Sequence, residues 1–434
     1  MFSALGYNSY ADSVVAHTIQ TTKLLVAGAN IQGRRINNED ADDYLLLDKY
    51  SFFAIYDGHN GDSCSNFLKQ KLLLELSKLE KLDEASIRSL YDKIDFEYRV
   101  VSPSAGSTAV IAVIDNEYNK VMFINLGDSR GMLVRNGKPI FETVDHTPKS
   151  ESEKLRIAKA GYYVHDGRIL GCLAVSRCFG DFSYKGNPHQ HQNYGVSIDP
   201  DISSWINLEP DDLIVLNCDG LNEANHDNND IAGHLPNNSK NTQELLTLVF
   251  NVINRSLRDS NDNISLLVIK INTSERSPER QKIYIPGNTK NLKYESLRRD
   301  SFKSTAAKNN IELLQALEER KKNLQKFFDG TLSMPCHQFL LACSRHSEDA
   351  EPDLDSLTTE LRKLSDPIWL KSLLDKFQES NDTNEDNEPF KLALPIRFRG
   401  FTKPKTNENP ILSTSSKLFG KKFSIFDLKP ATKQ

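Results

Sequence analysis

The stretch FFAIYDGHNG (Phe52–Gly61) joins an apolar run to an acid, a glycine and a histidine. The first five residues are bulky, apolar or both, which predicts a buried strand. Asp-Gly is ordinary turn chemistry, so Asp57 has a structural explanation as a turn residue. A turn residue needs no companions, whereas a metal ligand does. The ends of the other predicted strands therefore decide between the two explanations.

Further short runs rich in Val, Ile and Phe precede residue 273, and they predict strands. Between them lie segments with apolar residues at helical spacing, which predict helices over 66–79 and 243–254. The segment 150–161 has Ser150 at its start, Glu153 three residues on and Gly161 at its end, a capping box with a C-terminal stop that predicts a third helix. The two kinds of segment are interleaved without strict alternation. This order predicts an α+β layered domain rather than a doubly wound parallel sheet. The additional predicted strands cover 23–29, 108–115, 121–128, 212–219 and 263–271.

The composition of the chain changes near residue 273 and becomes more polar. Apolar residues follow one side of 309–328, and Asp366 and Pro367 provide a cap and a first turn for 365–378, so both segments are predicted helices. The chain then ends in an acidic stretch followed by a basic one. The expected organisation is an N-terminal extension (1–21), a main domain (22–272), a linker (273–308), a helical region (309–378) and a disordered tail (379–434).

The composition argues against several classes of protein. A net charge of −5 does not favour a nucleic-acid binder, and no apolar run is long enough to span a bilayer. The start of the chain lacks the basic residues and apolar core of a signal peptide. The six cysteines form no CxxC pair, which is typical of reduced intracellular proteins. We therefore expect a cytoplasmic or nuclear protein without a membrane or nucleic-acid partner.

Acids recur at the ends of the predicted strands. Several carboxylates at one edge of a sheet repel each other and raise each other's pKa unless a cation neutralises them. Ligands that are all oxygen select hard cations such as Mg²⁺ or Mn²⁺ rather than zinc. The sequence therefore predicts a site for hard divalent cations. The acids concerned are Asp57, Asp128 and Asp219 at the ends of runs, Asp262 at the start of one, and Asp40 after Glu39.

The neighbours of these acids suit phosphoryl chemistry. Two metals about 3.5–4 Å apart lower the pKa of a water between them and direct it at phosphorus. Arg35, four residues before Glu39, is placed for a bidentate grip on phosphate oxygens. His59, beside Asp57, is the natural proton donor to an alkoxide leaving group. Gly58 lacks a Cβ, so its backbone carbonyl can approach a metal or a bound water.

Eight motifs follow one another along the main domain: RRINNED, YDGHNG, GSTAVIAVI, INLGDSRGMLVRNG, DHTPKSESEKLRIAKAG, LAVSRCFGDFSYK, LNCDGLNE and DNISLLVI. In this order they resemble the motifs of the metal-dependent Ser/Thr protein phosphatases of the 2C type, the PPM family. The resemblance covers about residues 22–272 and implies a four-layer α–β–β–α sandwich of two antiparallel sheets flanked by helices. It also implies hydrolysis of phosphoserine and phosphothreonine by direct attack of a metal-bridging water, with no phosphoenzyme intermediate.

The resemblance implies a site with two ions, Mn²⁺ or Mg²⁺, and a weakly bound third. Asp57 resembles the carboxylate that bridges the two ions, and Asp219 and Asp262 resemble the other ligands of the first. Asp128, with Asp219, resembles the pair that holds the third ion. The segment 166–198 corresponds to the flap beside the active site, which influences the choice of substrate in the family.

The remaining roles also follow from the resemblance. The second ion takes the Gly58 carbonyl, and Glu39 and Asp40 lie in or near its shell. Arg35 resembles the phosphate-gripping arginine, and His59 resembles the general acid. The implied partners are phosphoprotein substrates, and we expect a monomer. The C-terminal helices either pack on the catalytic domain or bind a partner.

Two departures from the family pattern keep other functions open. Asn60 stands where the family has a glycine, although Asn tolerates left-handed backbone angles better than most residues. Asn222 and Glu223 stand where the family has Trp and Asp. These changes and the long tail motivate a pseudophosphatase that acts as a scaffold. A third alternative, a metal-dependent nuclease, needs a basic groove that the acidic balance does not suggest.

Three other polar residues of the motifs have a structural explanation. Arg130 and Arg177 are predicted to be structural ion-pair partners rather than substrate contacts. His146, in the DHTP motif, is predicted to be a buried hydrogen-bonding residue rather than a catalyst.

Overall fold

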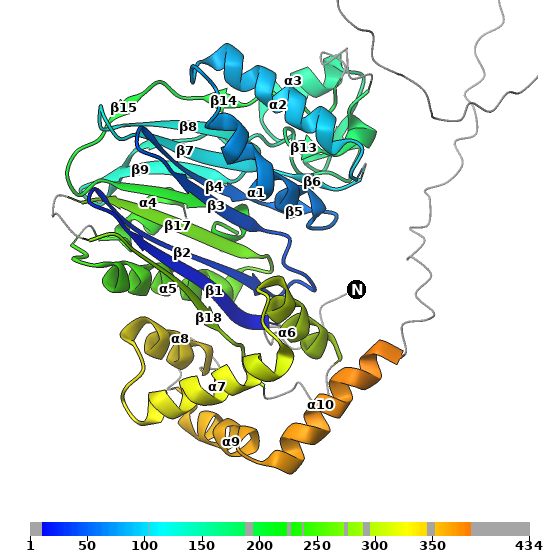
Figure 1. Cartoon of the computed structure of the whole chain (residues 1–434). Coiled ribbons are helices and arrows are strands. Elements are labelled where there is room, and N and C mark those ends of the chain that lie inside the picture. The colour runs from blue at the N-terminus through cyan, green and yellow to red at the C-terminus, as the bar shows by residue number, and fades with distance from the viewer. Residues whose placement is uncertain are drawn as a thin grey trace, which may run out of the picture. The chain divides into compact units, whose positions relative to one another are not determined.

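Two antiparallel sheets packed face to face form the centre of the molecule (Figure 1). The computed structural model describes residues 11–102, 104–186, 194–223, 227–236, 238–272, 277–289, 296–344 and 352–382. The first sheet has the strand order β10 (Lys138–Glu142), β9 (Arg130–Arg135), β16 (Leu213–Asn217), β17 (Ile264–Ile271), β2 (Leu24–Gly33), β1 (Ala11–Gln20) and β18 (Glu279–Ile285).

The second sheet contains β4 and β8, the strands that end just before Asp57 and Asp128. Its order is β14 (Asp201–Ile202), β8 (Lys120–Leu126), β7 (Ala109–Asp115), β4 (Tyr50–Tyr56) and β3 (Ala41–Leu46), with β15 (Ile206–Asn207) beside β8. A small sheet of β13 (Phe179–Gly180), β6 (Gly106–Ser107) and β5 (Gly58–His59) lies at one end of it, and β11 (Val164–His165) pairs with β12 (Arg168–Ile169).

Strand β4 explains why the opening stretch is apolar throughout. Successive side chains of a strand point to opposite faces. Phe53 and Ile55 pack into the core between the sheets. Phe52 and Tyr56 pack on the other face against helices α1 (Ser63–Leu76) and α2 (Glu84–Tyr98). Both faces of the strand are buried, so no polar alternation remains.

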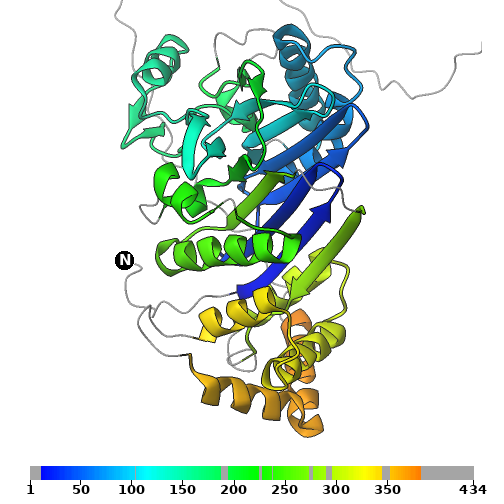
Figure 2. The ribbon, with the colours of Figure 1, turned by 90° about the vertical axis from the view of Figure 1, so that its left-hand side faces the viewer.

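Helices cover the outer face of each sheet, which gives four layers. Helices α1 and α2 cover the second sheet. Helix α5 (Thr242–Asp259) covers the first, together with C-terminal helices (Figure 2). The predicted α+β four-layer sandwich is confirmed. The remaining helices are α3 (Glu151–Lys159), α4 (Asn228–Gly233), α6 (Ser296–Lys308), α7 (Leu313–Phe328), α8 (Met334–Ser344), α9 (Leu354–Leu364) and α10 (Pro367–Asp382).

The structure corrects the expected organisation at both ends of the main domain. The described residues between 11 and 382 form one compact unit. The segment 1–21 contains strand β1, which pairs with both β2 and β18. The segment 273–308 contains strand β18 and helix α6 and is therefore not a linker throughout. Strand β18 is polar because it is an edge strand whose first four residues are exposed.

The C-terminal helices complete the core on the α5 side. Phe250 of α5 packs against Phe339 of α8, with ring centroids 5.1 Å apart. Phe302, Leu317 and Leu324 are buried in the same cluster. Packing on the catalytic domain, the first of the two expectations for these helices, is confirmed. Helix α10 runs four residues beyond the expected end at 378, and the rest of the predicted tail lies outside the described residues. Within the described part of the chain, no helix combines the length and apolarity needed to cross a membrane.

Candidate active site

The predicted acids meet at one end of the sandwich. Asp57 follows β4, Asp128 follows β8, and Asp219 opens a short 3-10 turn after β16. Asp262 precedes β17 and Asp40 precedes β3. The charges of the other four acids all act on Asp57. The structure therefore brings together carboxylates that are up to about two hundred residues apart in the sequence.

Asp57 is held in place by Thr108, the residue before β7. Its backbone N–H donates to Thr108 Oγ1 at 3.1 Å, and the Thr108 N–H donates to the Asp57 carbonyl at 2.9 Å. The Thr108 hydroxyl also lies 2.7 Å from Ser129 Oγ. Thr108 thus ties the end of β4 to the start of β7 and to the turn after β8.

Asn263 fixes the loop that carries the N-terminal site residues. Its amide nitrogen donates to the carbonyls of Gln32, at 2.7 Å, and Asn37, at 2.9 Å. Its amide oxygen accepts the backbone N–H of Glu39 at 2.9 Å. Since Asn263 follows Asp262, the same short segment places Asp262, Glu39 and Asp40, three of the residues predicted to bind ions. Asp40 is held in addition by Ser265, whose hydroxyl donates to Oδ2 at 2.7 Å.

The carboxylates at this end lack sufficient positive charge from the protein. Burial, with repulsion by neighbouring acids, raises the pKa of Asp57 and of Asp128 well above the ordinary range. The same causes raise the pKa of Asp40 to about 7 and that of Asp219 to about 6. Burial also raises the pKa of Asp262, although Arg35 opposes it.

This electrostatic pattern fits bound divalent cations. Ligand atoms of Asp40, Asp57 and Cys218 lie within 4.8 Å of one another. Cys218 is not a suitable ligand, because soft sulfur does not suit hard cations and its thiol donates to the Asn263 carbonyl at 3.4 Å. Its sulfur also accepts the Ser265 N–H at 3.1 Å. The usable donors are then carboxylate and carbonyl oxygens, which suit Mn²⁺ or Mg²⁺.

Gly58 and Glu39 approach each other closely. A Cβ on Gly58 would lie 2.4 Å from the Glu39 carbonyl oxygen, so no larger residue fits there without a shift of the backbone. The Glu39 carboxylate accepts the Gly61 N–H at 3.0 Å, and burial raises the pKa of this carboxyl group. Asn60 lies between Gly58 and Gly61 in the sequence and has φ +57°. This is the left-handed conformation, which Asn tolerates better than most residues.

Arg35 lies at the rim of the acids. Its Nη2 is 2.5 Å from Asp262 Oδ2, and its Nε donates to the Asn261 carbonyl at 3.2 Å. The side chain is 52% exposed, so the guanidinium is held by the protein yet open to a ligand.

The comparisons with known proteins agree with this geometry. Residues 16–255, more than half of the chain, match the family model for protein phosphatase 2C. The chain belongs to the protein phosphatase 2C family. Its fold and family are those of a metal-dependent Ser/Thr protein phosphatase, as the sequence predicts.

Relatives of this 2C-type phosphatase are similar over most of the catalytic region. "Protein phosphatase 1A" of Homo sapiens is 34% identical over 282 residues, which cover 58% of this chain and 72% of the relative. "Protein phosphatase 1B" of Homo sapiens is 32% identical over 272 residues, or 56% of each chain. A crystal structure of a phosphatase from Toxoplasma gondii has the same fold, with a TM-score of 0.57, 24% identity, and coverage of 62% of this chain and 99% of that one.

In this 2C-type phosphatase His59 contacts a buried acid, Asp181, that was not among the predicted site residues. Its Nε2 contacts the carboxylate of Asp181, which is 1% exposed. The same carboxylate accepts a hydrogen bond from the Cys178 thiol at 3.2 Å. A Cβ on Gly106 would lie 2.4 Å from His59 Nε2, so Gly106 is needed for this close approach. Asp181 lies in the quoted motif LAVSRCFGDFSYK, but nothing in the motif marks it as a partner of His59.

The departure at Glu223 is accommodated by hydrogen bonds. Its carboxylate accepts the Ser260 hydroxyl at 3.3 Å and the Asn261 N–H at 3.2 Å. It thus supports the turn that leads into Asp262. Neighbouring Asn222 accepts a hydrogen bond from the Asn217 amide at 2.7 Å.

The structural roles predicted for three other motif residues are confirmed. Arg130 makes two hydrogen bonds to Asp145, at 2.9 and 2.8 Å. Arg177 pairs with Glu153 at 2.8 Å and with Asp201 at 2.9 Å. His146 is buried, and its Nδ1 accepts the backbone N–H of Gly127 at 3.1 Å.

The predicted flap is described only in part. Strand β12, strand β13 and the 3-10 turn Phe182–Tyr184 fall within 166–198, while 187–193 lie outside the described residues.

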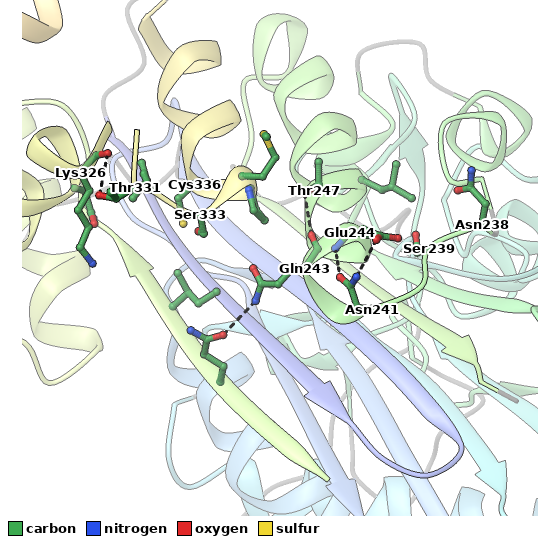
Figure 3. A pocket seen from close by; sticks show the side chains of 17 residues that line it. Asn238, Ser239, Asn241, Gln243, Glu244, Thr247, Lys326, Thr331, Ser333 and Cys336 are labelled. Atoms are coloured by element: carbon green, nitrogen blue, oxygen red, sulfur yellow. Dashed lines mark hydrogen bonds between the residues drawn. The ribbon is translucent and has the colours of Figure 1, made fainter. Parts of the chain in front are cut away.

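A cavity of about 810 Å³ is lined by side chains from the segment between Asn238 and Cys336 (Figure 3). It is bounded by the start of α5, by β18 and by the turn between α7 and α8, and no predicted site residue lines it. Gln243 of α5 and Gln281 of β18 contact each other across it at 3.2 Å.

Proposed function

We propose that this phosphatase hydrolyses phosphoserine and phosphothreonine in proteins by direct attack of water, without a phosphoenzyme intermediate. The observation that carries the proposal is the group of acids whose pKa values are raised by burial and by one another. These carboxyl groups stay ionised together only when cations lie beside them, and the protein itself does not supply enough positive charge.

The proposed ions are two Mn²⁺ or Mg²⁺, with a weaker third. Asp57 would be shared by the two ions, with Asp219 and Asp262 completing the first. The Gly58 carbonyl, Glu39 and Asp40 would serve the second. Asp128 with Asp219 would hold the third. When bound, such ions supply a water that is nucleophilic at neutral pH and neutralise charge on the phosphate.

Arg35 is proposed to bind the phosphate oxygens that do not react. Phosphoryl transfer depends mainly on positioning and on neutralisation of charge. The contacts of Arg35 with Asn261 and Asp262 orient the guanidinium before a substrate arrives. A planar guanidinium then offers two parallel donors to the phosphate.

His59 is proposed to donate a proton to the leaving alkoxide of the serine or threonine. The contact of Nε2 with Asp181 orients the ring, so Nδ1 is the nitrogen left for the leaving group. Asp181 acts through the histidine and is a positioning residue.

The pseudophosphatase alternative has no remaining support from the two departures. Asn60 adopts the left-handed turn, and Glu223 hydrogen-bonds the turn before Asp262. Neither change removes a proposed ligand. The nuclease alternative is disfavoured by membership of the protein phosphatase 2C family.

We further propose phosphoprotein substrates, a monomeric state, and a location in the cytoplasm, the nucleus or both. Partner binding through the C-terminal helices also stays a proposal. Size-exclusion chromatography with light scattering tests the monomer, and microscopy of the tagged full chain tests the location.

A phosphatase assay on the full chain with increasing Mn²⁺ or Mg²⁺ tests the proposed reaction. We expect metal-dependent hydrolysis of p-nitrophenyl phosphate and of a phosphothreonine peptide. Asp57→Asn should lower the rate by at least about a hundredfold. Asp48→Asn, in the exposed turn between β3 and β4, is the matched control. Turnover without metal, or equal rates for the Asp57 variant and wild type, would contradict the proposal.

A further inference from the structure

Helix α6 belongs to the C-terminal part of the chain, yet it packs beside the catalytic loop between β2 and β3. Phe302 and Ala306 are buried in the core, where α6 packs against β1, α7 and α10, and they anchor the helix. Residues 301, 305 and 308 lie three or four apart and therefore share another face of the helix. Ser301 and Thr305 contact Gln32, near the end of β2, and Lys308 contacts Asn38, in the loop that follows β2 (α6 in Figure 1).

The first contact between α6 and the loop is a buried network around Gln32. Gln32 is 2% exposed, and its amide nitrogen lies 2.9 Å from the Arg35 carbonyl, 2.7 Å from the Ile36 carbonyl and 2.7 Å from Ser301 Oγ. The Ser301 hydroxyl is 3.2 Å from the same Ile36 carbonyl. Thr305 Oγ1 donates to the amide oxygen of Gln32 at 3.2 Å. The backbone that carries Arg35 is thus held on the side that faces α6.

The second contact is Lys308, at the end of α6. Its ammonium donates to the Asn38 carbonyl at 2.6 Å and lies 2.6 Å from the carboxylate of Asp62. Asn38 precedes Glu39 in the loop, and Asp62 is the N-cap of α1, three residues after His59. One cation therefore joins the loop of the proposed phosphate grip to the loop of the proposed general acid.

We propose that Ser301, Thr305 and Lys308 are positioning residues for catalysis, which set the path of the loop 33–40 and so the place of Arg35. The inference rests on the proposed role of Arg35 in binding phosphate. It makes α6 part of the catalytic apparatus rather than only part of the core. A purely structural helix would need Phe302 and Ala306 but not three polar contacts with carbonyls and side chains of the catalytic loops.

Lys308→Met in the full chain tests the ammonium, because Met keeps most of the side-chain length without the charge. We expect the inhibition constant of inorganic phosphate, measured against p-nitrophenyl phosphate, to rise by about three- to tenfold. The value of KM should rise more than kcat falls. Backbone amides of 33–40 should exchange hydrogen faster, which is a readout independent of turnover. Lys308→Arg, which keeps a cation and donors, should restore most of the phosphate affinity.

Two matched controls lie on the same helix. Lys303→Met removes a lysine and Ala307→Ser adds a hydroxyl, and both positions lie on a different face of α6 from Ser301, Thr305 and Lys308. Both changes should leave phosphate inhibition and loop exchange unchanged. The double variant Ser301→Ala/Thr305→Val provides a second test and should weaken phosphate binding as Lys308→Met does. A weakening equal to that caused by the control variants would overturn the inference.

A double-mutant cycle with Arg35→Ala separates this inference from the proposed function. If α6 acts through Arg35, Lys308→Met should weaken phosphate binding much less in the Arg35→Ala background than in wild type. Full additivity of the two changes would overturn the positioning role while leaving the function intact. If Arg35→Ala itself left phosphate inhibition unchanged, the proposed role of Arg35 would fail, and the positioning role with it.

Discussion

Two groups of partly buried acids in this molecule behave in opposite ways. Around Asp57 the carboxylates face one another, and their pKa values are raised. Around Glu153 two guanidinium groups, from Arg156 and Arg177, each lie 2.8 Å from the carboxylate. There the pKa falls to about 2, although burial alone would raise it. The difference lies in the neighbouring charges. Arginines of the protein neutralise Glu153, whereas the charges that act on Asp57 are those of other acids.

The C-terminal helices repeat the compensated arrangement. Glu360 of α9 and Arg320 of α7 are 4% and 2% exposed and form two hydrogen bonds, at 3.0 and 2.9 Å. Glu360 also accepts the N–H of Thr289, and Arg320 donates to the carbonyl of Pro286. Burial opposes these partners, which nonetheless lower the pKa of Glu360. A structural cluster is thus complete by itself, whereas the acids of the active site need a ligand.

The largest expected effect comes from deleting residues 273–434, the part of the chain that holds the Arg320–Glu360 pair. The organisation expected from the sequence, with a linker at 273–308 after the main domain, suggests that a chain lacking 273–434 stays soluble and active on small esters. The structure predicts the opposite, because residues such as Phe302, Leu324 and Phe339 are buried against the catalytic domain. Each such side chain contributes about 1.5–3 kcal/mol. Expression of 1–272 should give insoluble or unfolded protein, measured by yield and circular dichroism. A soluble, folded and active fragment would contradict this prediction.

Breaking the buried pair should be the next largest effect. Glu360→Gln leaves the Arg320 guanidinium buried without its counterion, and we expect a loss of about 3–5 kcal/mol in the free energy of unfolding. Urea unfolding at pH 7 measures it. Glu318→Gln, on the exposed side of α7, serves as the control. Below the melting temperature kcat should be unchanged, since the pair does not contact the acids of the site. Equal stability of Glu360→Gln and wild type would show that the pair is not needed.

The Glu153 cluster should control stability in acid. The folded pKa of about 2 lies below the ordinary 4.5, so this carboxylate stabilises the fold fully above about pH 4.5. That contribution is lost as the pH falls from 4.5 towards 2. Glu153→Gln should therefore be less stable than wild type at pH 7, and the gap should narrow in acid. Parallel stability curves for the two proteins from pH 7 to pH 3 would exclude this role.

The smallest effect should have the opposite sign. Asp219→Asn removes one of the mutually repelling charges, so in metal-free protein at pH 8 it should stabilise the fold by about 1 kcal/mol. The partial exposure of the site limits the gain. Thermal melting in a chelating buffer measures it, with Asp48→Asn as the control. A clear loss of stability in metal-free protein would mean that Asp219 is structurally compensated.

Much of the fold follows from local patterns in the sequence. The apolar run of β4 identifies a strand buried on both faces, and Ser150 caps α3 as its capping box predicts, with the Glu153 N–H 3.5 Å from its hydroxyl. Strands β1 and β18 were not predicted. The polar residues of β18 resemble those of a linker because an edge strand is exposed.

The residues of the site are also predictable only in part from local sequence patterns. The acids could be predicted because each stands at the end of a strong apolar pattern. Asp181 could not, because its role depends on β13 folding back beside His59. Lys308 could not either, since 270 residues separate it from Asn38 in the sequence and only tertiary packing unites them.

The central claim is that the acids around Asp57 form a site for divalent cations. Calorimetric titration of Mn²⁺ into the metal-free full chain at pH 6.5, in two buffers of different protonation enthalpy, tests it most directly. The pKa values of about 7 for Asp40 and about 6 for Asp219 predict that binding releases protons. Asp57→Asn should abolish most of the binding. No binding by wild type, or unchanged binding by Asp57→Asn, would contradict the account.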